Sequence, residues 1–216
     1  MSTIFVLRHQ RKKHPTGPRT LIQCNSSVNG IKHFCNKKNT EVLIYSPFNN
    51  TLVSDVSEIL PRILKERPTL EKLIIQAALG DVTRKRKSEV LKEDYIRLLN
   101  LVDGLNVKVF LSGPHAPVNC GDEIFSRVLM LNKWLKKTCE QTTVTFIDNF
   151  NIFWERRHLF SSNGLHLNRS GAKRLISNIF YSVKHAPSAL SQNKVHPVPK
   201  QISPVQPEQA KIKMAR

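Results

Sequence analysis

The stretch FSSNGLHLNRSGAKRL, residues Phe160 to Leu175, predicts a loop that ends where an α-helix begins. Asn168 is a favourable N-cap, because its side-chain oxygen can accept a hydrogen bond from an amide of the first helical turn. The helix is predicted over Arg169–Val183. His166 lies in the loop directly before this helix, so the stretch brings a titratable side chain to a helix start.

Upstream of this stretch, short β-rich runs alternate with segments of helical spacing. The predicted strands are Thr20–Gln23, Glu41–Tyr45, Leu73–Ala77, Val107–Leu111 and Val144–Ile147. The other predicted helices are Val53–Lys65, which Pro61 should break or kink, Ser88–Val102 and Asp122–Cys139. Such alternation is typical of a parallel sheet with helices on both faces. We therefore predict an α/β fold, a flavodoxin-like three-layer sandwich around a five-stranded parallel sheet.

The 216 residues suffice for one domain with tails. We expect residues 1–18 to be a basic disordered segment, 19–186 to be the domain, and 187–216 to be a disordered tail rich in Pro, Gln and Lys. The apolar run Ile4–Leu7 is too short for a signal peptide, and no run approaches a membrane span. A cytoplasmic or nuclear location without membrane contact is expected.

The formal net charge of +18 favours polyanionic partners such as RNA. The four cysteines form no C-x-x-C pair and have no histidine cluster at zinc spacing. We therefore expect free thiols, with no metal and no cofactor.

Two side chains on the loops of this sheet suggest chemistry. In open α/β sheets, ligands bind at the carboxyl ends of the strands. Ser26 follows the first predicted strand, and His166 precedes the last helix. Serine and histidine on two loops at one sheet edge are the residue types of a nucleophile and its general base.

At these residues the sequence resembles the SGNH hydrolases, also called GDSL esterases and lipases. It is similar in particular to the esterase-like domain of the first open reading frame in vertebrate, notably fish, LINE retrotransposons. The similar segments are VFLSGP at Val109–Pro114, FSRVLMLNKWL at Phe125–Leu135, FIDNFNIFW at Phe146–Trp154 and NGLHLNRSGAKRL at Asn163–Leu175. The resemblance implies the SGNH fold and an acyl or acetyl ester as substrate.

The family's catalytic blocks are only partly present. The first block, G-D-S in the family, is C-N-S here and keeps Ser26. The glycine of the second block falls at Asn50, and the oxyanion asparagine of the third block is Gly80. The last block, D-G-x-H, keeps His166 but has Asn163 in place of the aspartate. The resemblance thus implies a degenerate triad of Ser26, His166 and Asn163, with degenerate oxyanion positions at Gly80 and Asn50.

Three hypotheses about function follow. The first is an SGNH-like protein of retrotransposon origin with little or no carboxylester hydrolysis. The second is a weak esterase acting through Ser26 and His166, either as a dyad or after deamidation or the approach of another carboxylate, such as Asp81 or Asp148. The third is an RNA-binding module with a basic surface and with Phe48, Trp154 and Phe160 nearby for stacking. Its cations are Arg84, Lys85, Arg86, Lys87, Arg156 and Arg157.

Overall fold

The computed structural model describes residues 19–23, 42–45, 52–76, 80–83 and 87–186. At its centre is a five-stranded sheet in the order β2-β1-β3-β4-β5, in which every pair of neighbours is parallel. The strands are β1 (Thr20–Gln23), β2 (Val42–Tyr45), β3 (Lys72–Gln76), β4 (Lys108–Ser112) and β5 (Thr145–Ile147). The predicted parallel sheet is confirmed, and each strand end lies within one residue of its predicted position.

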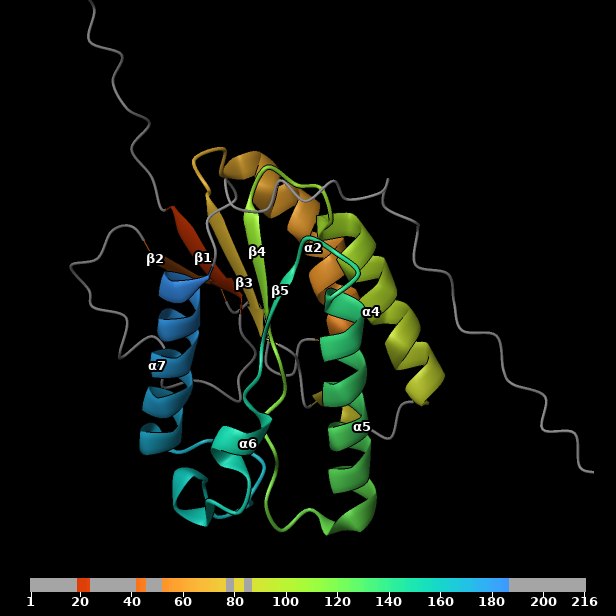
Figure 1. The fold of residues 1–216 in the computed structure, drawn as a ribbon, viewed down its shortest axis with the longest axis vertical. Coiled ribbons are helices and arrows are strands. Elements are labelled where there is room, and N and C mark those ends of the chain that lie inside the picture. The colour runs from red at the N-terminus through yellow and green to blue at the C-terminus, as the bar shows by residue number, and fades with distance from the viewer. Residues whose placement is uncertain (1–18, 24–41, 46–51, 77–79, 84–86, 187–216) are drawn as a thin grey trace, which may run out of the picture.

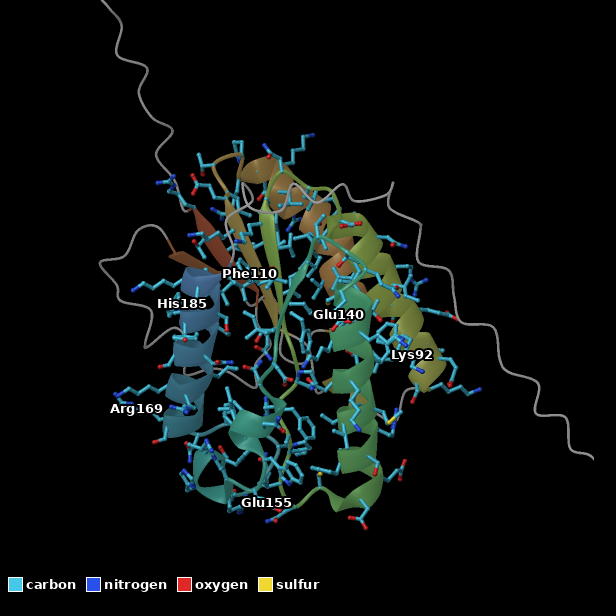
Figure 2. All side chains as sticks on the ribbon, viewed as in Figure 1. Lys92, Phe110, Glu140, Glu155, Arg169 and His185 are labelled. Atoms are coloured by element: carbon cyan, nitrogen blue, oxygen red, sulfur yellow. The ribbon has the colours of Figure 1, made fainter. Side chains whose placement is uncertain are left out.

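Helices cover both faces of this sheet, as the alternating pattern predicted (Figure 1). One face carries α2 (Val53–Glu66), α4 (Ser88–Val102) and α5 (Gly121–Cys139). The other face carries α7 (Arg169–His185), whose two ends are marked by Arg169 and His185 in Figure 2. Three short helices were not predicted, namely α3 (Gly80–Thr83), α6 (Phe150–Phe153) and the 3-10 helix η2 (Arg157–Leu159).

The two-residue period of a strand divides the core into two layers. Side chains that alternate along a strand point to opposite faces of the sheet. In β4, Val109 and Leu111 pack with α2, α4 and α5, whereas Phe110 packs with α6 and α7. Ile74 of β3 likewise joins the α7 side. Because both faces are covered, consecutive positions inside the central strands are apolar, as in Leu73–Ile75 of β3 and Val109–Leu111 of β4.

Pro61 does not break α2, which continues to Glu66. A proline within a helix cannot donate to the carbonyl four residues earlier. In α2 the proline lies on the exposed side, while Val56, Leu60 and Ile63 are buried against the sheet. The apolar face therefore holds both halves of the helix in place, and the expected break is absent.

Three sequence-based expectations concern metals, thiols and membranes. In the described part of the chain, no group of three or more His, Cys, Asp or Glu side chains is placed to hold a metal ion. Cys120 and Cys139 are free thiols, whereas Cys24 and Cys35 lie outside the described residues. No helix among those described has the length and apolarity needed to cross a bilayer.

Candidate active site

A buried polar network joins the carboxyl ends of the strands. Gln76 and Ser112 end β3 and β4 and are paired in register. The Ser112 hydroxyl donates to Gln76 Oε1 at 2.7 Å, and Asn149 Nδ2 donates to Ser112 Oγ at 2.9 Å. Asn178 of α7 extends the network by donating to Asn149 Oδ1 at 2.9 Å. These satisfied buried groups fix the edge of the sheet from which the functional loops depart.

The loop that carries His166 is held by its own backbone hydrogen bonds. Phe160 and Leu167 form an antiparallel bridge. Within this bridge the Ser161 amide donates to the His166 carbonyl at 2.8 Å. The His166 side chain is left exposed. The loop therefore presents the imidazole to solvent at the N-terminal end of α7, at the sheet edge where the strands end.

Asn168 is the N-cap of α7, as predicted. Its Oδ1 accepts from the Gly171 amide at 3.0 Å. Its Nδ2 donates to the carbonyls of His158 at 2.7 Å and Phe160 at 3.1 Å. One amide side chain thus caps the helix and ties it to the preceding loop, a role that needs both a donor and an acceptor.

Asn163 also shapes the loop, but with its oxygen alone. Its Oδ1 accepts from the Leu165 amide at 3.0 Å and from the His166 amide at 3.1 Å. These two amide donors identify the side-chain atom they contact as the oxygen. The other end of the side chain is therefore NH₂, which can only donate. The His166 ring has no hydrogen bond to Asn163 or to any other described residue.

The other carboxylates considered from the sequence are used elsewhere. Asp81 is fully buried at α3 and accepts from the Val53 amide at the start of α2. Asp148 accepts from the Phe150 amide at 3.0 Å and from Asn132 at 3.3 Å. Neither forms a hydrogen bond or ion pair with His166. The expectation that one of them could replace the missing aspartate is therefore wrong for this conformation.

His115 lies beneath the His166 loop and was not predicted as a site residue. It is 3% exposed, and its ring lies 5.5 Å from that of Phe153 and 5.6 Å from that of Phe160. Its Nε2 donates at 3.2 Å to the carbonyl of Leu165, the residue before His166. The pKa of His115 is lowered to about 4, mainly by burial and to a smaller extent by the nearby His166, while the hydrogen bond to the Leu165 carbonyl raises it. His115 is therefore neutral at pH 7, and its buried Nδ1 has no partner among the described residues. The sequence signal that could have identified His115 is its position three residues after the end of β4, in the run SGPH.

Besides the His115–Leu165 hydrogen bond, a backbone contact that we call the Gly164 clasp joins the loop after β4 to the His166 loop. The Val118 amide donates to the Gly164 carbonyl at 3.0 Å. Gly164 has φ of +70°, and a Cβ there would lie 2.0 Å from the Val118 carbonyl oxygen. Only glycine fits both the left-handed backbone and the close approach. The fold therefore requires Gly164 in the N-G-L-H stretch, independently of any catalytic role of this stretch.

Gly80, the predicted degenerate oxyanion position, begins α3. A Cβ added there would meet no atom within 4 Å. The position therefore has room for the Cβ of another residue. Ser26 and Asn50 lie outside the described residues, so the Ser26–His166 pairing remains a prediction.

The predicted basic surface is described in part. Arg84, Lys85, Arg86 and Phe48 lie outside the described residues. Lys87 and Arg156 are exposed. Arg157 is exposed too, but its guanidinium donates to the Ser161 and Ser162 carbonyls at 3.0 and 2.8 Å. Phe160 is 5% exposed and packs in the core, so the expectation that it stacks on a ligand is wrong, whereas Trp154 is 50% exposed.

Comparisons with known proteins agree with this architecture. Protein-family models and curated proteins give no match. The esterase domain of the ZfL2-1 ORF1 protein, from the zebrafish ZfL2-1 retrotransposon, is 32% identical. The match covers 76% of this chain and 98% of that domain, with a TM-score of 0.44.

Two bacterial proteins show the fold. A member of the lipolytic G-D-S-L family from Veillonella parvula is 12% identical, with a TM-score of 0.63, over 77% of this chain and 98% of that one. The esterase EstA from Pseudoalteromonas is 13% identical, with a TM-score of 0.59, over 77% and 97% of the two chains. The parallel sheet, the histidine loop before the last helix and the identity to the zebrafish domain place the chain in the SGNH (GDSL) hydrolase family.

Proposed function

We propose that this protein is an SGNH hydrolase of retrotransposon origin that retains the family fold and has little or no carboxylester hydrolase activity. The observation that carries the proposal is the position of Asn163. Its only acceptor atom is occupied by the Leu165 and His166 amides. The general base position is therefore kept, while its electrostatic support is missing.

The chemistry of a serine esterase explains why this replacement matters. The base histidine takes the proton of the serine through one ring nitrogen, while a carboxylate accepts a hydrogen bond from the other and stabilises the imidazolium. An aspartate at position 163 could accept the two backbone amides with one oxygen and keep the second oxygen for the ring. The NH₂ of asparagine can only donate to the ring, which favours the tautomer unable to accept the serine proton. The equivalent change costs about 10⁴-fold in serine proteases.

Gly80 adds a second loss. A side-chain donor in an oxyanion hole contributes about 10²–10³-fold to the rate, and glycine has none. The two losses need not add, because the parts of one catalytic device act together. Both nevertheless lower the same rate, that of acyl transfer to Ser26.

The test is hydrolysis of p-nitrophenyl acetate by the wild type and by the variants Ser26→Ala, Asn163→Asp and Asn163→Asp/Gly80→Asn. We expect the wild type and Ser26→Ala to give equal rates within twofold. The double variant should exceed the wild type by about 10²-fold or more, and adding Ser26→Ala should abolish this gain. Circular dichroism checks that each variant is folded.

The alternative is a weak esterase that acts on acyl or acetyl esters through Ser26 and His166. A wild-type rate at least tenfold above that of Ser26→Ala would favour this alternative and contradict the proposal. A double variant that stays at the wild-type rate would show that the two replacements are not what disables the site.

A second candidate function is binding of RNA or another nucleic acid. It is supported by the net charge of +18 and by the exposed Lys87 and Arg156. Phosphate contacts make affinity fall steeply with salt. Affinity for single-stranded RNA should therefore decrease strongly between 50 and 200 mM salt. Neutralising Arg84–Lys87 should flatten the dependence, and no change on neutralisation would exclude this surface.

A further inference from the structure

A groove lies between α4 and α5, on the opposite face of the sheet from α7 and the His166 loop. It has a volume of about 430 Å³, within the usual range for ligand pockets. Tyr95 of α4 and Trp134 of α5 meet edge to face, with ring centroids 6.5 Å apart. In Figure 1 the two helices lie apart toward the N-terminal end of α4, where Ser88, Leu91 and Lys92 line the groove.

The rim of the groove is cationic. It contains Lys92 from α4, labelled in Figure 2, and Arg127, Lys133 and Lys137 from α5. None of the described residues that line the groove is acidic. The three lysines form no ion pair with any described residue. Arg127 is anchored, because its guanidinium donates to the Val82 carbonyl at 3.2 Å. Three lysines thus line one recess without an ion pair to a described residue.

The floor of the groove is apolar. Val82, Leu91 and Leu131 line it, and each is at most 5% exposed. The half-buried Trp134 adds an aromatic wall. Met130 is 63% exposed at the edge. Methionine and tryptophan are over-represented at protein-binding surfaces, because one adapts its shape and the other buries a large area.

We propose that this groove binds an acidic amphipathic peptide segment of a partner protein. Apolar side chains of the segment would enter the floor, and its carboxylates would accept hydrogen bonds from the lysines of the rim. The lining residues of α5 recur at the spacing of one helix face, from Arg127 to Lys137. They therefore extend for about 15 Å, the length of about three helical turns. This is the helix-in-groove mode of recognition.

The polar side chains of the groove favour a peptide over a nucleic acid. Apart from the Ser88 hydroxyl, they are lysine and arginine, which only donate hydrogen bonds. Carboxylates only accept, so they match this set. The edges of nucleic acid bases donate as well as accept, and here they would meet an aliphatic floor. In an acidic peptide, apolar side chains would contact the apolar floor, and the flanking carboxylates would pair with the lysines and Arg127 of the rim.

A segment of another protein is favoured over the two end segments of this sequence, because those segments carry the wrong charge. Residues 1–18 contain four cations and no acid, and residues 187–216 contain five cations and one acid, Glu208. Neither end can neutralise the rim. The proposal is also independent of ester hydrolysis, since α5 and α7 cover opposite faces of the sheet.

The chain offers a direct reporter, because its two tryptophans are Trp134 and Trp154. In the full-length Trp154→Phe protein, fluorescence comes from Trp134 alone. The probe is a synthetic 16-residue peptide without tryptophan, with leucines on one helical face and glutamates elsewhere. Control probes are a scrambled peptide, a peptide with lysine in place of glutamate, and single-stranded RNA. We expect saturable binding of the acidic peptide with a shift of the Trp134 emission.

Charge reversal then locates the site. Lys133→Glu/Lys137→Glu should weaken binding at least tenfold. The matched control Lys173→Glu/Lys184→Glu changes the net charge equally at exposed positions of α7 and should weaken it less than threefold. Equal loss in both doubles, or absence of saturable binding, would overturn the proposal. RNA binding that shifts Trp134 and is lost only in the groove variant would instead assign the groove to nucleic acid.

Discussion

The His166 loop and the α4–α5 groove use their polar groups in opposite ways. In the loop, the side chains of Asn163, Asn168 and Arg157 all form hydrogen bonds with backbone groups. In the groove, Lys133 and Lys137 bond to nothing described. The loop is held tightly but lacks the charge that its histidine requires. The groove carries charge that the fold does not require.

The comparison shows that the fold of a catalytic loop and its electrostatics are separable. Two backbone amides can donate to a neutral amide oxygen at position 163 as well as to a carboxylate, so the replacement leaves the loop intact. Only the imidazolium of a reacting site needs the negative charge. Unpaired surface cations contribute little to stability, so the lysines of the groove can be changed to test binding without disturbing the fold. Four predictions test this contrast, from the largest expected effect to the smallest.

The largest effect is expected at the Gly164 clasp. Gly164→Ala should lower the free energy of unfolding by about 3 kcal/mol, from backbone strain and from contact with the Val118 carbonyl. Gly104 has a similar φ of +76° but open space around it, so Gly104→Ala should cost about 1 kcal/mol. Urea denaturation measures both. Equal losses would show that the clasp adds nothing beyond the strain of a positive φ.

His115 should make stability depend on pH. Its pKa is lowered from 6.5 to about 4 by burial, so below pH 6.5 the unfolded chain binds a proton that the folded protein excludes. The stability is complete above pH 6.5 and falls by on the order of 3 kcal/mol as the pH drops to 4. Carboxylates titrate in the same range, so the measurement is the difference between wild type and His115→Gln. A difference that does not change with pH would contradict the neutral buried imidazole.

Arg157 should contribute modestly to the loop. Arg157→Ala removes two hydrogen bonds, to the Ser161 and Ser162 carbonyls, and should cost about 1 kcal/mol in thermal or urea unfolding. Arg156 is its neighbour, and its exposed side chain forms no hydrogen bond with a described residue. Arg156→Ala should therefore be neutral within about 0.5 kcal/mol. If both variants lose the same stability, net charge rather than the two bonds is responsible.

The smallest effect is expected in the groove. Lys133→Ala/Lys137→Ala should leave the free energy of unfolding unchanged within about 0.5 kcal/mol, because neither lysine has a partner to lose. A loss of more than 1 kcal/mol in urea denaturation would mean that these lysines serve the fold, and the contrast between loop and groove would disappear.

Much of the fold was predictable because its signals are local. The alternation of β-rich runs and helical spacing located all five strands, and Asn168 marked the start of α7 through its capping chemistry. Pro61 shows the limit of local rules. Its intrinsic tendency to end a helix was outweighed by the burial of Val56, Leu60 and Ile63 on the same helix. That burial depends on contact with the sheet, and the helix propensity of a single residue contains no information about such contacts.

The candidate site could be located from the sequence only through the family resemblance. His166, Asn163 and Gly80 were assigned from the family's blocks, and their catalytic roles stay predictions. His115, Gln76 and Asn149 were missed, because nothing in their local sequence reveals that they meet around Ser112 or Leu165. Arg157 was predicted as a binding cation, yet its guanidinium holds the loop.

The sequence by itself determined the order of strands and helices, the charge of the chain and the residues at the predicted catalytic positions. These properties follow from residue type and spacing along the chain. Only the tertiary structure decided which atom of Asn163 is occupied, that His115 is buried beneath the histidine loop, and that the cations of α4 and α5 surround an apolar recess. Hydrogen-bond partners and burial are set by segments distant in sequence, so they exist only once the sheet has brought those segments together.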